Sequence, residues 1–124
     1  MSTRIRPILF VFLLFLTACA RLDYNNIGVH ADVVKGGQAQ IDEGHIVDVN
    51  GLPGIWLAGH HTTHGAPFAN LGNARIGDRV CVYSQCYTVF SKVVVPTTFR
   101  PGNGVAPLVL QTSWFGNDLL VLAH

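Results

Sequence analysis

The chain has 124 residues, of which 49% are hydrophobic and only 12% are charged. This balance excludes a disordered tail and a coiled coil, both of which need more charge, and the length allows a single hydrophobic core. The formal net charge is +1 and no basic run lies beyond the extreme N-terminus, so nucleic acid is not expected as a partner.

The N-terminus has the pattern of an export signal. Arg4 and Arg6 precede an apolar run over residues 8–18. As a helix this run would be about 16 Å long, which is too short to cross a hydrocarbon core of about 30 Å. We therefore expect residues 1–20 to be a signal peptide and the domain to work outside the cytoplasm.

The end of this segment resembles a bacterial lipobox. Residues 16–19 read Leu-Thr-Ala-Cys, and in a lipobox the cysteine carries lipid after cleavage. We expect lipid on Cys19 and hence a membrane anchor made of acyl chains. The alternative is secretion after ordinary cleavage behind Ala20, because Ala18-x-Ala20 also fits the small-x-small rule.

From Asp23 onward, short β-branched and aromatic runs recur between Gly, Pro and Asn residues without helical periodicity. The pattern predicts an all-β domain over residues 21–124. About seven strands are expected, a number that favours a closed or nearly closed barrel. The expected strands span residues 27–34, 45–49, 55–58, 79–83, 86–94, 107–112 and 119–123.

Two other segments stand out along the chain. One short helix is expected at residues 67–71, because Pro67 suits a first helical turn and Gly72 can end it. Residues 96–106 hold two Pro and two Gly, which predicts a long crossover loop. Long loops on small barrels often line sites.

Cys81 and Cys86 are an even pair in the oxidising compartment that the export signal implies. A four-residue loop over residues 82–85 would place them opposite each other on antiparallel strands, within disulfide reach. We expect a disulfide. Two free buried thiols or one reactive thiol are the alternatives, although no basic neighbour in sequence favours a thiolate.

The most specific block begins at Leu57. Residues 57–68 read Leu-Ala-Gly-His-His-Thr-Thr-His-Gly-Ala-Pro-Phe, followed by Leu71 and then by Ile-Gly-Asp-Arg-Val over residues 76–80. This block resembles the sortase family, in which a strand ends in Ala-Gly-His, a loop leads to Pro-Phe and a Leu, and Gly-Asp opens the next strand. The Thr-Thr-x-Gly-x-Pro-Phe loop is most similar to the class E sortases of actinobacteria.

The resemblance covers residues 27–123 and implies a small sortase-like closed barrel of about seven to eight strands. Sortases are cysteine transpeptidases that cleave a C-terminal sorting motif at Thr-Gly and join the new end to an amine. The implied partner is therefore a peptide with a sorting-motif-like segment, or a cell-wall component. We expect that the protein needs no cofactor and that it is a monomer.

The resemblance implies His60 as acid and base, and the residue after Thr112 as nucleophile. That residue is Ser113 where the family has Cys, and a hydroxyl needs an aligned base and an oxyanion hole, whereas a thiol can be held partly as a thiolate. The family's Arg would fall between Gly116 and Asp118, where no basic residue stands. We expect transpeptidation to be weak or lost and the groove to bind peptide or cell wall.

The substrate groove is expected to include His64, Thr112 and Trp114. His64 stands where class E members with a similar loop usually carry Tyr, a residue linked to choosing Leu-Ala-x-Thr-Gly over Leu-Pro-x-Thr-Gly. The preferred motif therefore stays open.

An enzyme of another class is the first alternative. Ser113 and His60, with Asp78 or Asp118 as the acid, would form a Ser-His-Asp set of a serine-type hydrolase or acyltransferase. Both acids also suit turns, Asp78 in the Gly-Asp turn and Asp118 in a hairpin.

Metal binding is the second alternative. His60, His61 and His64 could bind Zn²⁺ or Cu²⁺, with His30 or His45 as a fourth ligand. The segment has the composition of a loop, however, and no acidic partner follows within it. We expect these histidines to line the surface or the groove and expect no bound metal.

Overall fold

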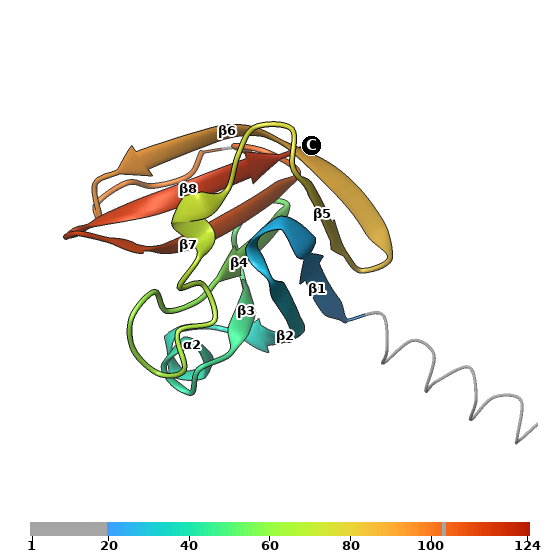
Figure 1. The fold of residues 1–124 in the computed structure, drawn as a ribbon. Coiled ribbons are helices and arrows are strands. Elements are labelled where there is room, and N and C mark those ends of the chain that lie inside the picture. Colours follow the sequence, from blue (N-terminus) through green and yellow to red (C-terminus); the bar gives the residue numbers. More distant parts are fainter. Residues whose placement is uncertain (1–19, 103) are drawn as a thin grey trace, which may run out of the picture.

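The computed structural model describes residues 20–102 and 104–124, in which eight strands close into a barrel (Figure 1). The strands are β1 (Arg21–Tyr24), β2 (Val29–Gly36), β3 (Ile46–Val49), β4 (Ile55–Ala58), β5 (Arg79–Val82), β6 (Gln85–Val95), β7 (Leu108–Trp114) and β8 (Asn117–Ala123). Around the barrel they follow the order β1-β2-β3-β4-β7-β8-β6-β5, and β5 pairs with β1. The pairs β2–β3 and β4–β7 are parallel. The predicted all-β closed barrel is confirmed.

The seven predicted strands correspond to β2 through β8, and their ends differ from the prediction by at most two residues. Strand β1 was not predicted. It has only four residues, of which Leu22 and Tyr24 are buried and Arg21 is exposed. So short an alternation is a weak signal, and pairing with β2 and β5 on its two sides is what holds the segment extended.

The predicted position of the short helix was wrong. Residues 67–70 form turns, and a 3-10 helix follows at Leu71–Asn73, because Phe68 and Leu71 are drawn fully into the core. The α-helix of the described chain is instead α2 (Gln38–Asp42), in the crossover between the parallel strands β2 and β3. Its first turn is held by Gln40, whose side-chain oxygen accepts a hydrogen bond from the Gly37 amide at 2.9 Å.

All eight strands contribute to one apolar cluster inside the barrel, because alternate side chains of each strand point inward. The fully buried members include Leu22, Tyr24, Ile46, Leu57, Phe68, Leu71, Leu108, Leu110 and Leu119.

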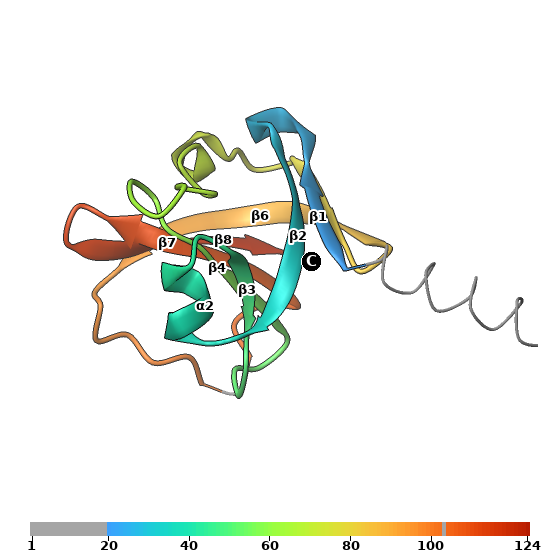
Figure 2. The ribbon, with the colours of Figure 1, turned by 90° about the horizontal axis from the view of Figure 1, so that it is seen from below.

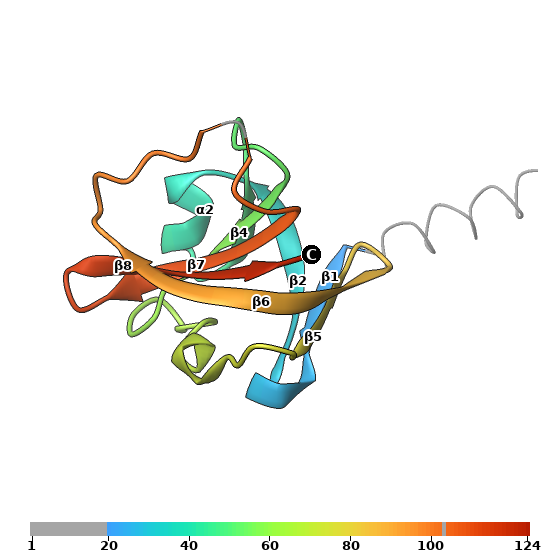
Figure 3. The same ribbon diagram turned by 90° about the horizontal axis from the view of Figure 1, so that it is seen from above.

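A second cluster covers the outer face of the sheet, where Trp56 of β4 meets Val109 of β7 and Leu120 of β8. The segment between β6 and β7 runs outside the barrel (Figure 3) and packs Phe99 and Val105 on this cluster. Strand β7 is therefore buried on both faces over Leu108–Leu110, which explains its unbroken apolar run.

The β5–β6 hairpin has a tighter turn than predicted. Val82 pairs with Gln85, so the loop contains only Tyr83 and Ser84, with φ of 52° and 62°. Two left-handed residues are what a type I′ turn requires. The next pair outward is Cys81 with Cys86, whose Cα atoms are 4.0 Å apart and whose sulfurs form a disulfide.

The predicted signal peptide and the lipidation site at Cys19 concern residues 1–19, which lie outside the described residues. Over residues 20–102 and 104–124, none of the helices has the length and apolar character needed to span a bilayer.

Candidate functional site

A cleft of about 320 Å³ opens between α2, the end of β4 and the β7–β8 hairpin. Both residues predicted to be catalytic, His60 and Ser113, line this cleft. Ser113 is exposed, and the His60 side chain is 20% exposed. The remaining lining residues are Gln38, Ile41, Val49, Leu52, Ala58, Gly59, Gln111, Thr112 and Asp118.

Parallel pairing of β4 with β7 brings the two predicted residues to the same edge of the sheet. Ala58 lies opposite Gln111, so the residues that follow on each strand leave the sheet side by side. The Gly59 amide donates to the Gln111 carbonyl at 3.2 Å, and a Cβ on Gly59 would lie 3.1 Å from Phe68. The glycine of the Ala-Gly-His motif thus allows close packing immediately before His60.

Thr112 was predicted to line the groove, and it does so with a hydroxyl that is already used. Its Oγ1 donates to the Gly59 carbonyl at 2.8 Å, and the residue is 2% exposed. Thr112 therefore ties the end of β7 to the end of β4.

Ser113 lies directly opposite Asp118 in the β7–β8 ladder. The turn between the two strands contains only Phe115 and Gly116, with φ of 48° and 82°, so it is also a type I′ turn. Cross-strand partners share one face of a sheet. An acidic side chain therefore stands beside the predicted nucleophile and lines the same cleft.

Asp118 is partly buried, and this burial raises the pKa of its carboxyl group, although a hydrogen bond with Gln111 opposes the shift. Gln111 is itself fixed, because its Oε1 accepts a hydrogen bond from Trp56 Nε1 at 2.6 Å. Among the described residues that line the cleft, none is Lys or Arg. Within this described lining, the cleft thus presents an acid and no cation beside Ser113.

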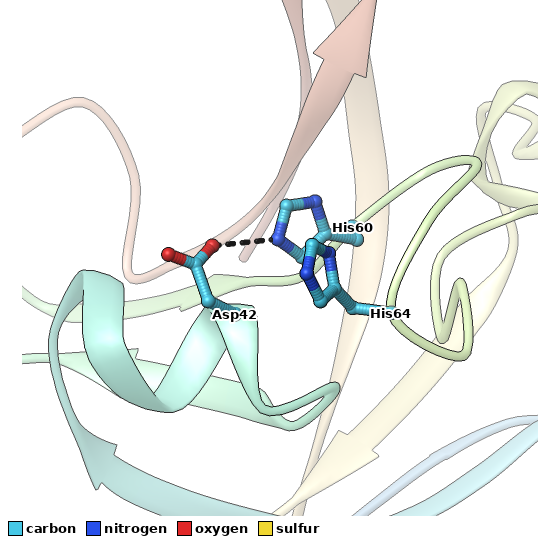
Figure 4. Close-up of side chains that lie close together, drawn as sticks. All are labelled: Asp42, His60 and His64. Atoms are coloured by element: carbon cyan, nitrogen blue, oxygen red, sulfur yellow. Dashed lines mark hydrogen bonds and ion pairs between the residues drawn. The ribbon is translucent and has the colours of Figure 1, made fainter.

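The hydrogen-bond partner of His60 comes from α2. Figure 4 shows the Asp42 carboxylate facing His60 and His64. Asp42 Oδ1 is 2.9 Å from His60 Nε2. The pKa of Asp42 is held below its usual value by a hydrogen bond from Gln38 and by the one from His60.

The contacts of His60 indicate the tautomer of its neutral ring. A carboxylate only accepts hydrogen bonds, so the neutral ring carries its proton on Nε2 and leaves Nδ1 as an acceptor. The Thr63 hydroxyl lies 3.2 Å from His60 Nδ1 and 3.1 Å from His64 Nδ1. Thr63 therefore donates to His60 and accepts from His64, and Nε2 of His64 has no hydrogen-bond partner among the described residues.

The three histidines of the predicted cluster are divided between two environments. The rings of His60 and His64 lie 4.5 Å apart. His61 instead packs on Trp114, with ring centroids 5.0 Å apart.

Trp114 was expected in the substrate groove, yet it does not line the cleft. Its ring covers Gly72, where a Cβ would lie 2.3 Å from the indole. Alternation along β7 explains the difference, because Trp114 points to the face opposite to Ser113.

Asp78, one of the two acids considered for a catalytic triad, has a structural environment. It accepts hydrogen bonds from Tyr24 Oη at 2.6 Å, Asn26 Nδ2 at 2.7 Å and the Arg75 amide at 2.9 Å. Burial opposes its ionisation, but these bonds keep its pKa below the usual value. Asp78 does not line the cleft.

Asp42 was missed by the sequence analysis. It lies 18 positions before His60, in a short polar segment between Gly37 and Gly44 that carries no motif. Only the packing of α2 beside the loop after β4 brings the two residues together (Figure 1).

A second cavity of about 190 Å³ adjoins the cleft and shares Leu52, Gln111 and Asp118 with it. Its walls are largely apolar and include Trp56 and Phe99, and the loop between β6 and β7 adds Arg100 and other residues. Both cavities are lined by residues of β7 and β8, whose hairpin projects from the barrel (Figure 2).

No family model matches the sequence, and no curated protein matches it. Solved structures do match. Sortase E from Streptomyces avermitilis is 19% identical, covers 86% of this chain and 86% of its own, and has a TM-score of 0.72. Sortase E1 from Streptomyces coelicolor, solved with a tripeptide in the active site, is 20% identical with 84% and 85% covered and a TM-score of 0.66.

Sortase C from Clostridium perfringens, solved with the C-terminal cell wall sorting motif, is 14% identical. The match covers 85% of this chain and 68% of that one, with a TM-score of 0.68. The closed barrel and these matches agree: this chain has the sortase fold.

Proposed function

We propose that this chain binds an extended, sorting-motif-like peptide in the cleft between His60 and Ser113, and that its transpeptidase activity is weak or lost. The observation that carries the proposal is the Ser113–Asp118 pair. If Ser113 and Asp118 correspond to the family's thiol and cation, as the motif resemblance implies, this pair offers a hydroxyl and an acid in their stead, which supports the proposal.

The shape and lining of the site support peptide binding. The cleft and the adjoining cavity share three residues, so together they offer an elongated site with a polar end at Ser113 and an apolar end at Trp56 and Phe99. A peptide in extended conformation can place one side chain in each cavity while its backbone passes Ser113. Two of the matching sortases hold a peptide or motif.

The local chemistry disfavours turnover. Ser113 needs a base to take its proton, yet both ring nitrogens of His60 are engaged, one by Asp42 and one by Thr63. The oxyanion formed by attack would develop beside the Asp118 carboxyl group, whose negative charge opposes it.

A serine-type hydrolase or acyltransferase is the second candidate, and the Asp42–His60 hydrogen bond favours it. A carboxylate that orients a histidine is the base half of a Ser-His-Asp triad. This candidate requires the His60 ring to turn so that Nδ1 leaves the Thr63 hydroxyl and meets Ser113. A fluorophosphonate probe that labels the wild type and spares Ser113→Ala would establish it.

We propose that the protein acts as a monomer outside the cytoplasm, anchored by lipid on Cys19. A single chain supplies both walls of the cleft. The Cys81–Cys86 disulfide suits an oxidising compartment. Mass spectrometry of membrane-extracted protein tests the anchor: acyl mass on Cys19 is expected, and a mature chain that begins at Arg21 without lipid would contradict it.

Fluorescence anisotropy with labelled Leu-Pro-x-Thr-Gly and Leu-Ala-x-Thr-Gly peptides tests the peptide site. We expect saturable binding of at least one peptide by the full-length chain in mild detergent. Ser113→Phe fills the cleft and should weaken binding at least about tenfold, a free-energy loss of about 1.4 kcal/mol.

The matched control is Thr88→Phe, at an exposed position of β6 that does not line the cleft. This variant should bind as the wild type does. Equal binding of a scrambled peptide, or equal affinity of both variants, would overturn the proposal.

A further inference from the structure

We infer that Asp42, His60 and His64 form a binding site for a divalent transition metal, with Zn²⁺ as the ion that suits these donors. The three side chains come from two separate segments, α2 and the loop after β4, and converge (Figure 4). One ligand atom of each lies within 4.8 Å of the others. This site shares His60 with the cleft of the proposed peptide function, but the argument for it does not depend on peptide binding.

The donors have the composition and spacing of a zinc site. Two imidazoles and one carboxylate are a ligand set of catalytic zinc, and the fourth position is left for water or another ligand. Bonds of about 2.0 Å in a tetrahedral set separate the ligand atoms by about 3.3 Å. Asp42 Oδ1 and His60 Nε2 are 2.9 Å apart, so small side-chain movements bring all three donors into range.

Surrounding residues already orient the donors. Gln38 Nε2 donates to Asp42 Oδ1 at 2.9 Å, and Thr63 contacts Nδ1 of both histidines. Outer partners of this kind hold metal ligands in place. The Nε2 atom of His64 remains unused, and that of His60 carries the proton that a metal would replace.

The backbone also holds the two segments together. Gly44, just beyond α2, has a φ of 95°, and a Cβ there would lie 2.5 Å from the His64 carbonyl oxygen. His64 itself adopts a left-handed conformation with φ of 51°, which is uncommon for a side-chain-bearing residue. The end of α2 therefore fits directly against the loop that turns His64 toward His60.

This inference revises the sequence-based expectation of no metal. That expectation rested on the loop composition of the histidine segment and on its lack of an acidic residue, whereas the acidic donor comes from α2. The site is accessible from solvent, because the side chain of Asp42 is 50% exposed and that of His60 is 20% exposed. Bound metal would occupy Nε2 of His60 and remove this nitrogen from proton transfer.

Isothermal titration of the untagged full-length chain with Zn²⁺ tests the site. We expect one ion per chain in the wild type. Asp42→Asn, His60→Ala and His64→Ala should each weaken binding by about tenfold or more. Co²⁺ bound to the wild type should show the strong visible absorption of a four-coordinate complex, and His64→Ala should lose it.

Two histidines provide matched controls. His61→Ala removes the ring that packs on Trp114, and His45→Ala removes an exposed ring whose Nε2 lies 3.4 Å from Glu43 Oε2. Both variants should bind Zn²⁺ as the wild type does. Asp42→Asn preserves side-chain size, so it remains informative if another variant fails to fold.

Zinc binding that is absent in the wild type would overturn the inference, as would binding that survives Asp42→Asn and His64→Ala unchanged. If zinc binding required His61, the ligands would be the three histidines of the loop after β4, and this result would also overturn the inference. None of these results bears on the anisotropy assay of peptide binding.

Discussion

The β5–β6 and β7–β8 hairpins share one backbone design. Each has a two-residue type I′ turn, formed by Tyr83 and Ser84 in the first hairpin and by Phe115 and Gly116 in the second. In each hairpin one cross-strand pair of residues closes the turn. The next residue pair away from the turn therefore occupies the same position in both hairpins.

The equivalent pairs carry different chemistry. Cys81 and Cys86 form a disulfide in the first hairpin, whereas Ser113 and Asp118 face each other in the second without a covalent bond. The disulfide restricts the unfolded chain and so stabilises the fold. An exposed hydroxyl beside a partly buried carboxyl contributes little to stability, so the second hairpin is the one available for function.

Replacement of Ser113 and Asp118 by the residues that the family reaction uses should have the largest effect, which is on the rate of transpeptidation. Ser113→Cys alone should raise this rate little, because Asp118 still opposes the oxyanion. The double variant Ser113→Cys/Asp118→Arg supplies thiol and cation together, and we expect transpeptidation about a hundredfold above the single variant. Mass spectrometry of peptide and amine products measures this ratio, and equal rates for the two variants would contradict the role of Asp118.

Removal of the disulfide should have the next largest effect. Cys81→Ser/Cys86→Ser releases a short loop, and the chain-entropy relation gives a loss of about 2 kcal/mol in the free energy of unfolding. The Tm should fall by about 10 °C, while peptide affinity stays unchanged. The equivalent double variant Ser113→Ala/Asp118→Ala should change stability by less than about 0.5 kcal/mol. Equal losses in both hairpins would remove the distinction between them.

The turns themselves provide a smaller test. Phe115 is 84% exposed and has a φ of 48°, so Phe115→Asn creates the Asn-Gly sequence favoured in type I′ turns. We expect the free energy of unfolding, measured in urea, to rise by about 1 kcal/mol.

Tyr83→Asn is the matched change in the first hairpin. It should destabilise the protein despite a similar φ, because Tyr83 Oη donates to Asp48 at 2.8 Å. Stabilisation by both variants would show that turn conformation alone decides the outcome.

Substitution of Asp118 should have the smallest effect on the free energy of unfolding, and the size of this effect depends on pH. Burial raises the pKa of Asp118, so ionisation is harder in the folded state than in the unfolded state. Stability associated with the protonated group is present at low pH and is lost as pH rises through the folded pKa. At neutral pH, Asp118→Asn should be more stable than the wild type by less than about 1 kcal/mol.

This difference should vanish below a pH of about 4, where both states of the wild type are protonated. Asp78→Asn is the control of opposite sign, because the pKa of Asp78 is lowered. It should destabilise the protein at neutral pH and do so less as the pH falls below about 4. Acid unfolding curves that move in the same direction for both variants would contradict the assigned environments.

The sequence contained enough to predict most of the barrel. Strand β4 matches its predicted span, since four apolar residues stand between turn residues and β4 is buried on both faces. Strand β1 and helix α2 were missed because β1 has only two buried side chains among its four residues and α2 has none. Short segments with so weak an apolar pattern take their conformation from tertiary contacts.

The site was predictable in part. The motif resemblance indicated that His60 and Ser113 belong to one groove, and both line the cleft. The partners of these two residues were not predictable, because Asp42 lies in a separate crossover and the Ser113–Asp118 register depends on a two-residue turn. Trp114 could be placed only once the inward and outward faces of β7 were known.

The most direct test of the central claim is a product assay on the wild type and Ser113→Ala. Each full-length chain is incubated with a sorting-motif peptide and an acceptor amine, and mass spectrometry follows cleavage and transfer while anisotropy follows binding. We expect both chains to bind the peptide and to give little or no product. Abundant product from the wild type that disappears in Ser113→Ala would show a working serine nucleophile and would contradict it.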